Sequence, residues 1–191
     1  MANTVQDRDL HAEKNRNEAK TGLNSFEGPQ EDLACGPFAS GDIVRFRPMT
    51  TADLDEVMVI ERTSFRFPWS TGFFLQELQV ACARSILAEI DGRIVGYVLF
   101  WMLPGALDIH NIAVHVDFRR RGIARVLLGQ VVSEAKRQSN VRVMLEVRRS
   151  NIQAQKLYES LGFVATRIRK GYYSDDGEDA LAMTLELVSK D

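Results

Sequence analysis

The sequence predicts an α/β fold, in which strands and amphipathic helices alternate along most of the chain. Short apolar segments with strand character are separated by segments whose apolar residues recur every three or four positions, as in helices. Asp91-Gly92 lies between two apolar segments and is a strong hairpin signal. A strand ending at Val114, a basic turn and a helix reaching Ala135 form a strand–turn–helix unit. No segment repeats another, so we expect one layered α/β domain.

The elements follow in the order β-α-α-β-β-β-α-β-α-β-β. Strands are expected at Ile43–Arg47, Arg84–Ile90, Arg93–Met102, Leu107–Val114, Val141–Val147, Phe163–Arg169 and Ala180–Val188. Helices are expected at Ala52–Ser64, Gly72–Gln79, Gly122–Ala135 and Ile152–Leu161. Thr51, Ser70 and Asn151 are suitable N-caps for three of these helices, and Gly162 is suited to end the last one.

Composition limits the function classes. A chain of 191 residues with 45% hydrophobic residues suits one globular domain with a sizeable core. A net charge of −2 gives no reason to expect direct nucleic-acid binding. No apolar run is long enough to span a membrane and no signal segment is evident, so we expect a cytoplasmic protein without membrane contact. Cys35 and Cys82 have neither metal-site nor redox spacing.

The first 40 residues differ from the rest of the chain. They are polar, rich in Asn, Glu and Lys, and their few apolar residues show no sustained period. We therefore expect residues 1–40 to form a disordered N-terminal extension and residues 41–191 to form the folded domain.

The turn before the long helix has the features of a phosphate site. A helix that starts on a glycine presents free backbone N–H groups and the positive end of its dipole, and this combination binds phosphate. Gly122 lacks a Cβ where an anion must approach, and three consecutive arginines, Arg119, Arg120 and Arg121, add positive charge. An ordinary turn with solvated arginines explains the same residues. A Walker or Rossmann pattern is not present.

Glu146 stands in an otherwise apolar strand, VRVMLEV. Burial of an unpaired carboxylate is costly, and it raises the pKa of the group towards the working range of a general base. A salt bridge to Arg142 or Arg148 would instead give the residue a structural role.

Residues Arg119–Ala124 have the form Arg/Gln-x-x-Gly-x-Gly/Ala, and Asn151–Phe163 have the form Asn-x-x-Ala-x-x-Leu-Tyr-x-x-x-Gly-Phe. Together the two segments resemble the GCN5-related N-acetyltransferase (GNAT) superfamily, in which the first forms the acyl-CoA pyrophosphate loop. The element order also matches, so the resemblance covers Ile43–Leu187. It implies the GNAT fold, a mixed central sheet of about seven strands with helices on both faces.

The resemblance implies an acetyl-CoA-dependent transfer to an amine, with no metal. It makes Glu146 the general base and Tyr158 the general acid, and the N–H of Val114 the oxyanion donor. The residues expected to bind acetyl-CoA are Ile112, Ala113, Val114, Arg119, Arg120, Arg121, Gly122, Ile123, Ala124, Arg125 and Asn151. On helical periodicity alone Tyr158 is a core residue, and Asn151 also suits a helix N-cap.

A narrower resemblance concerns the substrate. Three segments carry it: FPWS at Phe67–Ser70, LEVRRSN at Leu145–Asn151 and YY…DGEDALAM at Tyr172–Met183. They are similar to the RimI branch, which acetylates the N-terminal alanine of ribosomal protein S-eighteen. The resemblance implies a ribosomal protein's N-terminal peptide as partner, with Trp69, Tyr172 and Tyr173 lining its channel. A core role for Trp69 and a strand-anchoring role for the tyrosines explain these residues equally well.

Other substrates stay open. An α-amine has a pKa near 8 and lysine one of about 10.4, so a single carboxylate base suits the α-amine better. The acids at 175–179 would attract a basic peptide or would form a solvated turn. The RimI branch usually has Asp-Pro after its Asn-Ile-Ala-Val, whereas His115-Val116-Asp117 follows in this chain, and Val116 leaves that turn less rigid than proline would. The alternatives are a GNAT for lysine or a small amine, and a silent CoA- or partner-binding module. A tRNA-modification complex is a further candidate partner.

Overall fold

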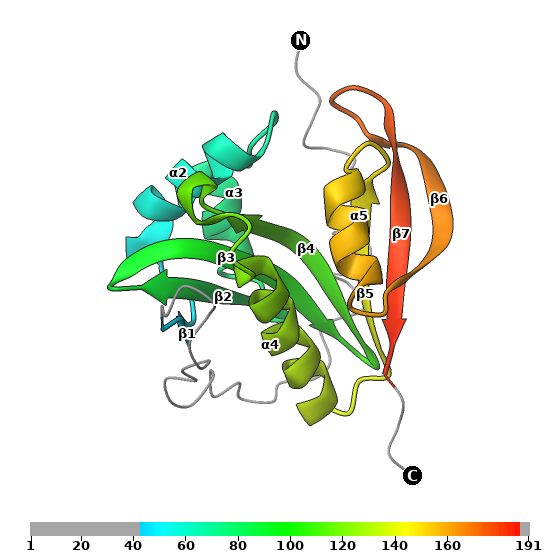
Figure 1. The fold of residues 1–191 in the computed structure, drawn as a ribbon, viewed down its shortest axis with the longest axis horizontal. Helices are drawn as coiled ribbons and strands as arrows, with labels where there is room; N and C mark the ends of the chain where they lie inside the picture. Colours follow the sequence, from blue (N-terminus) through cyan, green and yellow to red (C-terminus); the bar gives the residue numbers. More distant parts are fainter. Residues whose placement is uncertain (1–42, 188–191) are drawn as a thin grey trace. The chain divides into compact units, whose positions relative to one another are not determined.

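Strands and helices follow one another in the predicted order (Figure 1). The computed structural model describes residues 43–187, so the predicted N-terminal extension lies outside the described residues. The seven strands within that range are β1 (Arg45–Arg47), β2 (Ala83–Ile90), β3 (Arg93–Leu103), β4 (Ala106–Val114), β5 (Arg142–Arg148), β6 (Val164–Tyr173) and β7 (Glu178–Glu186). The four α-helices within it are α2 (Leu54–Ser64), α3 (Thr71–Glu77), α4 (Ile123–Arg137) and α5 (Ile152–Glu159). Two 3-10 turns, η1 (Thr51–Asp53) and η2 (Val116–Phe118), precede α2 and α4.

Several predictions of detail were wrong. The chain enters α2 through η1, and the N-cap of η1 is Thr50 rather than the predicted Thr51. The Thr50 N–H donates to the Asp53 carboxylate at 2.7 Å. Strand β6 is longer than expected and includes Tyr172 and Tyr173, which the sequence had placed between strands.

The described residues form two compact parts. The N-terminal part contains residues 43–102 and Ile109–Glu134, and the C-terminal part contains Leu103–Asp108 and residues 135–187.

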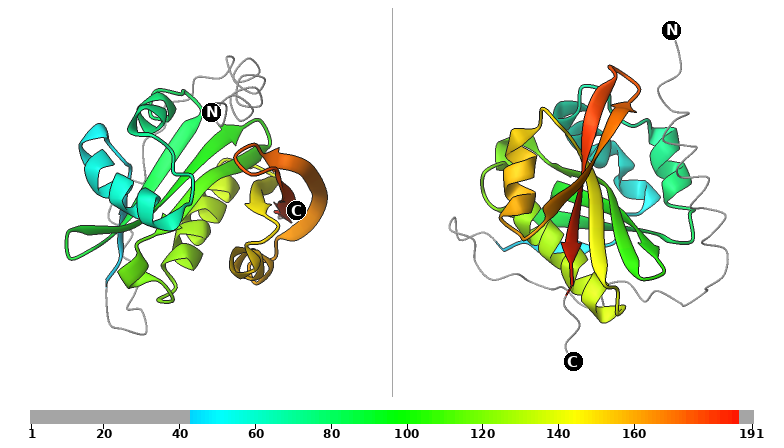
Figure 2. Two further views of the ribbon diagram at one scale, coloured as in Figure 1. Left: turned by 90° about the horizontal axis from the view of Figure 1, so that it is seen from above. Right: turned by 90° about the vertical axis from the view of Figure 1, so that its right-hand side faces the viewer.

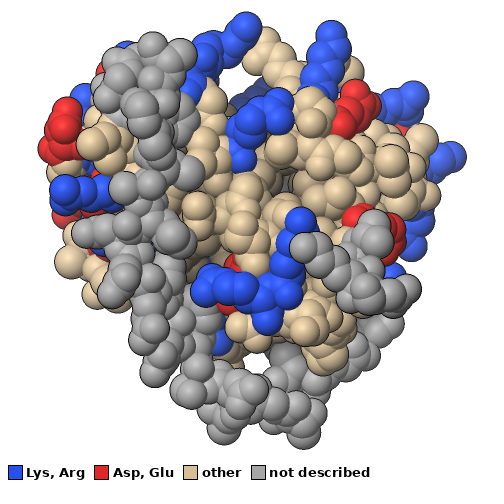
Figure 3. Space-filling view, turned by 60° about the horizontal axis from the view of Figure 1, so that its bottom comes forward, with Lys and Arg blue, Asp and Glu red and all other residues tan. Residues whose placement is uncertain are grey.

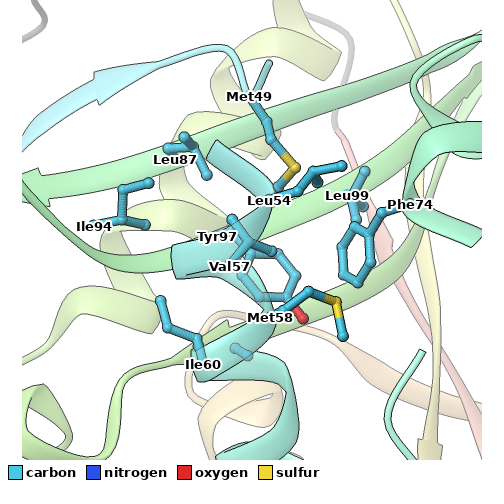
Figure 4. Packing of buried hydrophobic residues seen from close by; sticks show 11 residues of the cluster. Met49, Leu54, Val57, Met58, Ile60, Phe74, Leu87, Ile94, Tyr97 and Leu99 are labelled. Atoms are coloured by element: carbon cyan, nitrogen blue, oxygen red, sulfur yellow. The ribbon is translucent and has the colours of Figure 1, made fainter. Parts of the chain in front are cut away.

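In the N-terminal part, the strands lie in the order β1-β2-β3-β4, and helices cover both faces of these strands (Figure 2). Strands β1, β2 and β3 are antiparallel, and the β2–β3 turn contains the predicted Asp91-Gly92 pair with φ angles of 50° and 76°. Tyr97 of β3 belongs to the core cluster formed with α2 and α3 (Figure 4). Its neighbour Gly96 points to the opposite face, towards Ile123 and Leu127 of α4.

In the C-terminal part, the strand order is β5-β7-β6 and both pairs are antiparallel. Alternate residues of β5, such as Val143 and Leu145, are buried. Glu146 and Arg148 therefore share the other face of the strand. Helix α5 ends at Glu159, before the predicted Leu161, and Gly162 lies in the turn that follows, with a φ angle of 92° that suits glycine best.

Candidate active site

The turn before α4 combines two residues with positive φ angles. Arg120 has a φ of 66° and Gly122 a φ of 87°, and both residues are exposed. Alternation of this kind turns neighbouring backbone N–H groups to one side and makes an anion-binding concavity. The first helical hydrogen bond runs from the Val126 N–H to the Gly122 carbonyl, so α4 begins at the expected place. The sequence analysis singled out Gly122 for its missing Cβ, whereas the left-handed conformation of Arg120 was not predicted.

The arginines of this turn differ in what they contact. Arg119 donates to the Val114 carbonyl at 3.1 Å and to the Ser64 hydroxyl at 3.0 Å, so it ties the end of β4 to the end of α2. Arg121 donates to the Asp117 carbonyl at 3.2 Å, and its guanidinium lies 4.9 Å from the centre of the Phe118 ring. Both side chains are therefore ordered by their own chain.

Positive charge by itself does not single out this turn. Lys and Arg side chains stand at several separate places on the face shown in Figure 3. Arg120 and Arg125 are exposed, whereas Ile123 is 2% exposed and anchors the helix in the core. The backbone geometry of the turn, more than its charge, agrees with the predicted anion site.

Three of the residues expected to bind acetyl-CoA, Ile112, Ala113 and Val114, form the end of β4. Ile112 and Val114 are half-buried, and Ala113 between them is buried. The Ala113 carbonyl passes so close to Gly96 that a Cβ there would lie 2.9 Å from its oxygen. A buried strand and an edge that binds an extended ligand are both compatible with this placement.

Glu146 forms a salt bridge, but its partner is neither of the two arginines considered from the sequence. Its Oε1 accepts from Arg169 of β6 at 2.7 Å, and both side chains are about one-fifth exposed, at 22% and 18%. The two residues flank β7, where Glu146 pairs with Ala182 and Arg169 pairs with Ala180. These small alanines let the longer side chains meet above the middle strand. The guanidinium stabilises the carboxylate charge and fixes its direction.

Tyr158 is almost fully buried, with 6% of its surface exposed. Burial raises the pKa of its phenol to about 12, so the group is protonated at neutral pH. No hydrogen-bond partner of the hydroxyl is found among residues 43–187. Asn151 caps α5, since its side chain accepts from the Ala154 N–H at 3.1 Å. The core and capping roles considered from the sequence are therefore both present.

The acidic turn between β6 and β7 is paired with the chain's own arginines. Arg148 contacts Asp175 at 2.5 Å, Asp176 at 2.9 Å and Glu178 at 3.0 Å. Its guanidinium also lies 3.9 Å from the centre of the Tyr173 ring. Much of the charge expected to attract a basic peptide is thus already neutralised.

The aromatic residues predicted to line a peptide channel are held firmly. Trp69 is half-buried and its ring lies 4.3 Å from Phe73 and 5.5 Å from Phe74, measured between ring centres. Tyr172 lies under the Arg169 guanidinium at 4.2 Å and meets Tyr173 edge to face at 5.2 Å.

Sequence reasoning assigned no role to Glu61, which is 1% exposed and bonded to the Trp69 backbone. A glutamate at a core position of an amphipathic helix was the signal that could have identified it.

Within residues 43–187, no helix combines the length and apolarity that crossing a membrane requires. No group of three or more His, Cys, Asp or Glu side chains suited to hold a metal occurs in that range.

Comparison with known proteins gives one consistent family. Residues 54–163 match the model of the acetyltransferase (GNAT) family. A Salmonella typhimurium protein named ribosomal protein bS18-alanine N-acetyltransferase is 36% identical over 141 residues, which cover 73% of this chain and 95% of that protein. A Bacillus subtilis protein, provisionally given the same name, is 38% identical over 138 residues, covering 72% and 91% of the two chains. The crystal structure of the Escherichia coli ribosomal protein alanine N-acetyltransferase superposes with a TM-score of 0.71 at 32% identity, over 78% of this chain and 97% of that one.

Proposed function

This chain belongs to the GNAT family of acetyltransferases, and we propose that it transfers the acetyl group of acetyl-CoA to the N-terminal α-amine of a ribosomal protein that begins with alanine. The observation that carries the proposal is the 36% identity to a named ribosomal protein alanine N-acetyltransferase across 95% of that protein's length. The motif positions expected to supply a base and an acid hold a carboxylate, Glu146, and a phenol, Tyr158. This favours an enzyme over a silent binding module. A cytoplasmic location agrees with such a substrate.

In the proposed reaction, the amides of the turn at 120–124 bind the pyrophosphate of acetyl-CoA, and the end of β4 binds the pantetheine arm. The amine attacks the thioester carbonyl, whose developing negative charge is stabilised by the Val114 N–H. Glu146 accepts the proton that the amine loses, and Tyr158 protonates the sulfur as the carbon–sulfur bond breaks. The protonated state of Tyr158 supports its role as the acid, because its pKa is about 12.

The substrate class is tested with matched peptides. One peptide begins with a free alanine and contains no lysine, and a second has a blocked N-terminus and one internal lysine. We expect acetyl-CoA-dependent acetylation, followed by mass spectrometry, only of the first peptide. Modification of the second alone would assign the chain to the lysine-acetylating alternative. A panel of peptides that differ only at residue one then measures the preference for alanine.

The catalytic pair is tested separately from CoA binding. Glu146→Gln and Tyr158→Phe should each lower kcat by roughly 10²–10⁴-fold, the usual contribution of general acid–base catalysis. The Kd for CoA, measured by calorimetry, should stay within about twofold because neither residue is assigned to hold the cofactor. Unchanged kcat in either variant would remove that residue from the scheme and leave the family assignment intact.

A further inference from the structure

Glu61 lies on the buried face of α2, where the other side chains are apolar. In α2 the buried positions are Leu54, Val57, Met58, Ile60 and Glu61, and the glutamate is 1% exposed. An ionisable group so deep in a core needs donors for both of its oxygens.

Three neutral donors supply them. Oε1 of Glu61 accepts from the backbone N–H of Trp69 at 2.7 Å. Oε2 accepts from the Asn111 amide at 3.3 Å and from the hydroxyl of Tyr97 through a short hydrogen bond. Burial raises the pKa of the Tyr97 phenol well above its usual range, and the Glu61 charge acts in the same direction, so this hydroxyl remains a donor.

The donors come from three separate segments of the N-terminal part. Tyr97 belongs to β3, and its ring packs within the core cluster beneath α2 (Figure 4). Asn111 belongs to β4 and immediately precedes Ile112–Val114. Trp69 belongs to the loop between α2 and α3. The carboxylate therefore joins that loop to the strand end to which pantetheine binding is assigned.

The loop leaves α2 through an ordinary backbone hydrogen bond, and the Glu61 side chain holds it near its other end. The Glu61 backbone carbonyl accepts from the Phe65 N–H at 3.0 Å, while its side chain accepts from Trp69. The following residue, Ser70, caps α3 by accepting from the Phe73 N–H at 3.1 Å. The Trp69 backbone is thus fixed by Glu61 and its ring by the aromatic residues of α3.

We propose that Glu61 is a positioning residue, which sets the place of Trp69 relative to the end of β4 and thereby shapes the wall that contacts the peptide substrate. The inference rests on the proposed function for the identity of that substrate. In this proposal the length of the side chain matters more than its charge, because its oxygen must lie within hydrogen-bonding distance of the Trp69 N–H.

Two conservative variants change the polarity and the reach of the side chain separately. Glu61→Gln keeps the length of the side chain and an oxygen that can accept from Trp69, but it removes the charge and places an NH2 donor where Oε2 accepts from Asn111 and Tyr97. Glu61→Asp keeps the charge and withdraws both oxygens by about one carbon–carbon bond, roughly 1.5 Å. Glu77 of α3 provides the matched control, since it is 2% exposed and accepts from the Trp101 indole at 2.7 Å, away from the Trp69 backbone.

We expect Glu61→Asp to raise the peptide KM about tenfold and Glu61→Gln about threefold or less, because a displaced substrate wall costs more than a lost charge here. The acetyl-CoA KM should stay within about twofold in both, and Glu77→Asp should leave the peptide KM within about twofold. An equal or larger effect of Glu61→Gln would show that charge matters more than reach and would overturn the proposal. So would a tenfold effect of Glu77→Asp, which would reflect general loosening of the core.

A measurement without substrate tests the fixed loop directly. Hydrogen exchange followed by NMR should be at least about tenfold faster at the Trp69 amide in Glu61→Asp than in wild type or Glu77→Asp. Unchanged exchange would overturn the role of Glu61 whatever the substrate is. If exchange changes as expected and wild type acetylates no peptide, the proposed function fails while the loop contact stands. If Trp69→Phe leaves the peptide KM unchanged, Trp69 is not part of the substrate wall and the proposal is overturned.

Discussion

The close packing around Gly96 predicts a large effect from one added methyl group. Gly96 lies on β3 where the Ala113 carbonyl and two side chains of α4 converge. A Cβ at this position would lie 2.9 Å from the Ala113 oxygen, 3.3 Å from Leu127 and 3.4 Å from Ile123. The first of these distances is too short for a carbon–oxygen contact, so Gly96→Ala must displace something.

The neighbours have little freedom to move. The oxygen belongs to the backbone of β4, and Leu127 and Ile123 are 0% and 2% exposed. Overpacking of this kind costs about 1–3 kcal/mol, of which the better strand propensity of alanine recovers roughly 0.5–1 kcal/mol. We therefore expect Gly96→Ala to lower the free energy of unfolding by about 1–2 kcal/mol. It should also raise the acetyl-CoA KM, because α4 and the end of β4 carry the proposed cofactor site.

Gly129 of α4 is a control with the opposite expected sign. No atom lies within 4 Å of a Cβ built at Gly129, and the residue is exposed within a helix. Gly129→Ala should therefore stabilise the protein by about 0.5–1 kcal/mol through helix propensity. Urea unfolding of both variants, with midpoints and slopes compared, measures the two effects. The packing argument is refuted if Gly96→Ala is as stable as wild type, or if both variants shift in the same direction.

Two further predictions concern ion pairs. A hydrogen bond from Arg47 lowers the pKa of Asp53 from 3.8 to about 2, so the ionised carboxylate stabilises the fold above pH 3.8 and this stabilisation disappears as the pH falls through 2. Asp53→Asn should lower the free energy of unfolding by about 1 kcal/mol at pH 7, a value reduced for the partial exposure of Arg47, and by almost nothing at pH 2. Urea unfolding at the two pH values measures this. An equal loss at both would contradict the assignment. Arg148→Met should lower stability because it leaves three carboxylates without their counter-charge, and Arg148→Lys should lose less. Thermal unfolding at low and high salt checks this, since salt should reduce the Arg148→Met deficit, and a deficit independent of salt would argue for lost packing on Tyr173.

The features that the sequence predicted correctly depend on residues close together in the chain. Ser70 and Asn151 cap helices by accepting from N–H groups three residues later, at 3.1 Å in both cases. The Asp91-Gly92 turn requires positive φ angles at both positions, which these residues tolerate best. Local rules of this kind can be read without knowing which strands are neighbours.

The features that the sequence missed depend on strand order. Glu146 pairs with Arg169, 23 positions away, because β7 with its two alanines lies between β5 and β6. Periodicity on β5 alone offered only the arginines of the same strand. Glu61 and Asn111 are 50 positions apart and meet only because α2 packs against β4. An acidic residue in an apolar stripe could be noticed in the sequence, but its donors could not be named.

Arg119 shows how a motif position can be interpreted once its contacts are known. The superfamily pattern allows Arg or Gln there, which is unexpected if the residue serves to attract phosphate by charge. In this chain the Arg119 side chain donates to the Val114 carbonyl at 3.1 Å and to Ser64 at 3.0 Å. A glutamine amide also carries N–H donors and can brace the same carbonyl, whereas a charge-based role would exclude it. The contact is therefore compatible with both residues of the pattern, and it favours a role for Arg119 in holding the strand end, while the backbone of the turn remains the proposed anion-binding group.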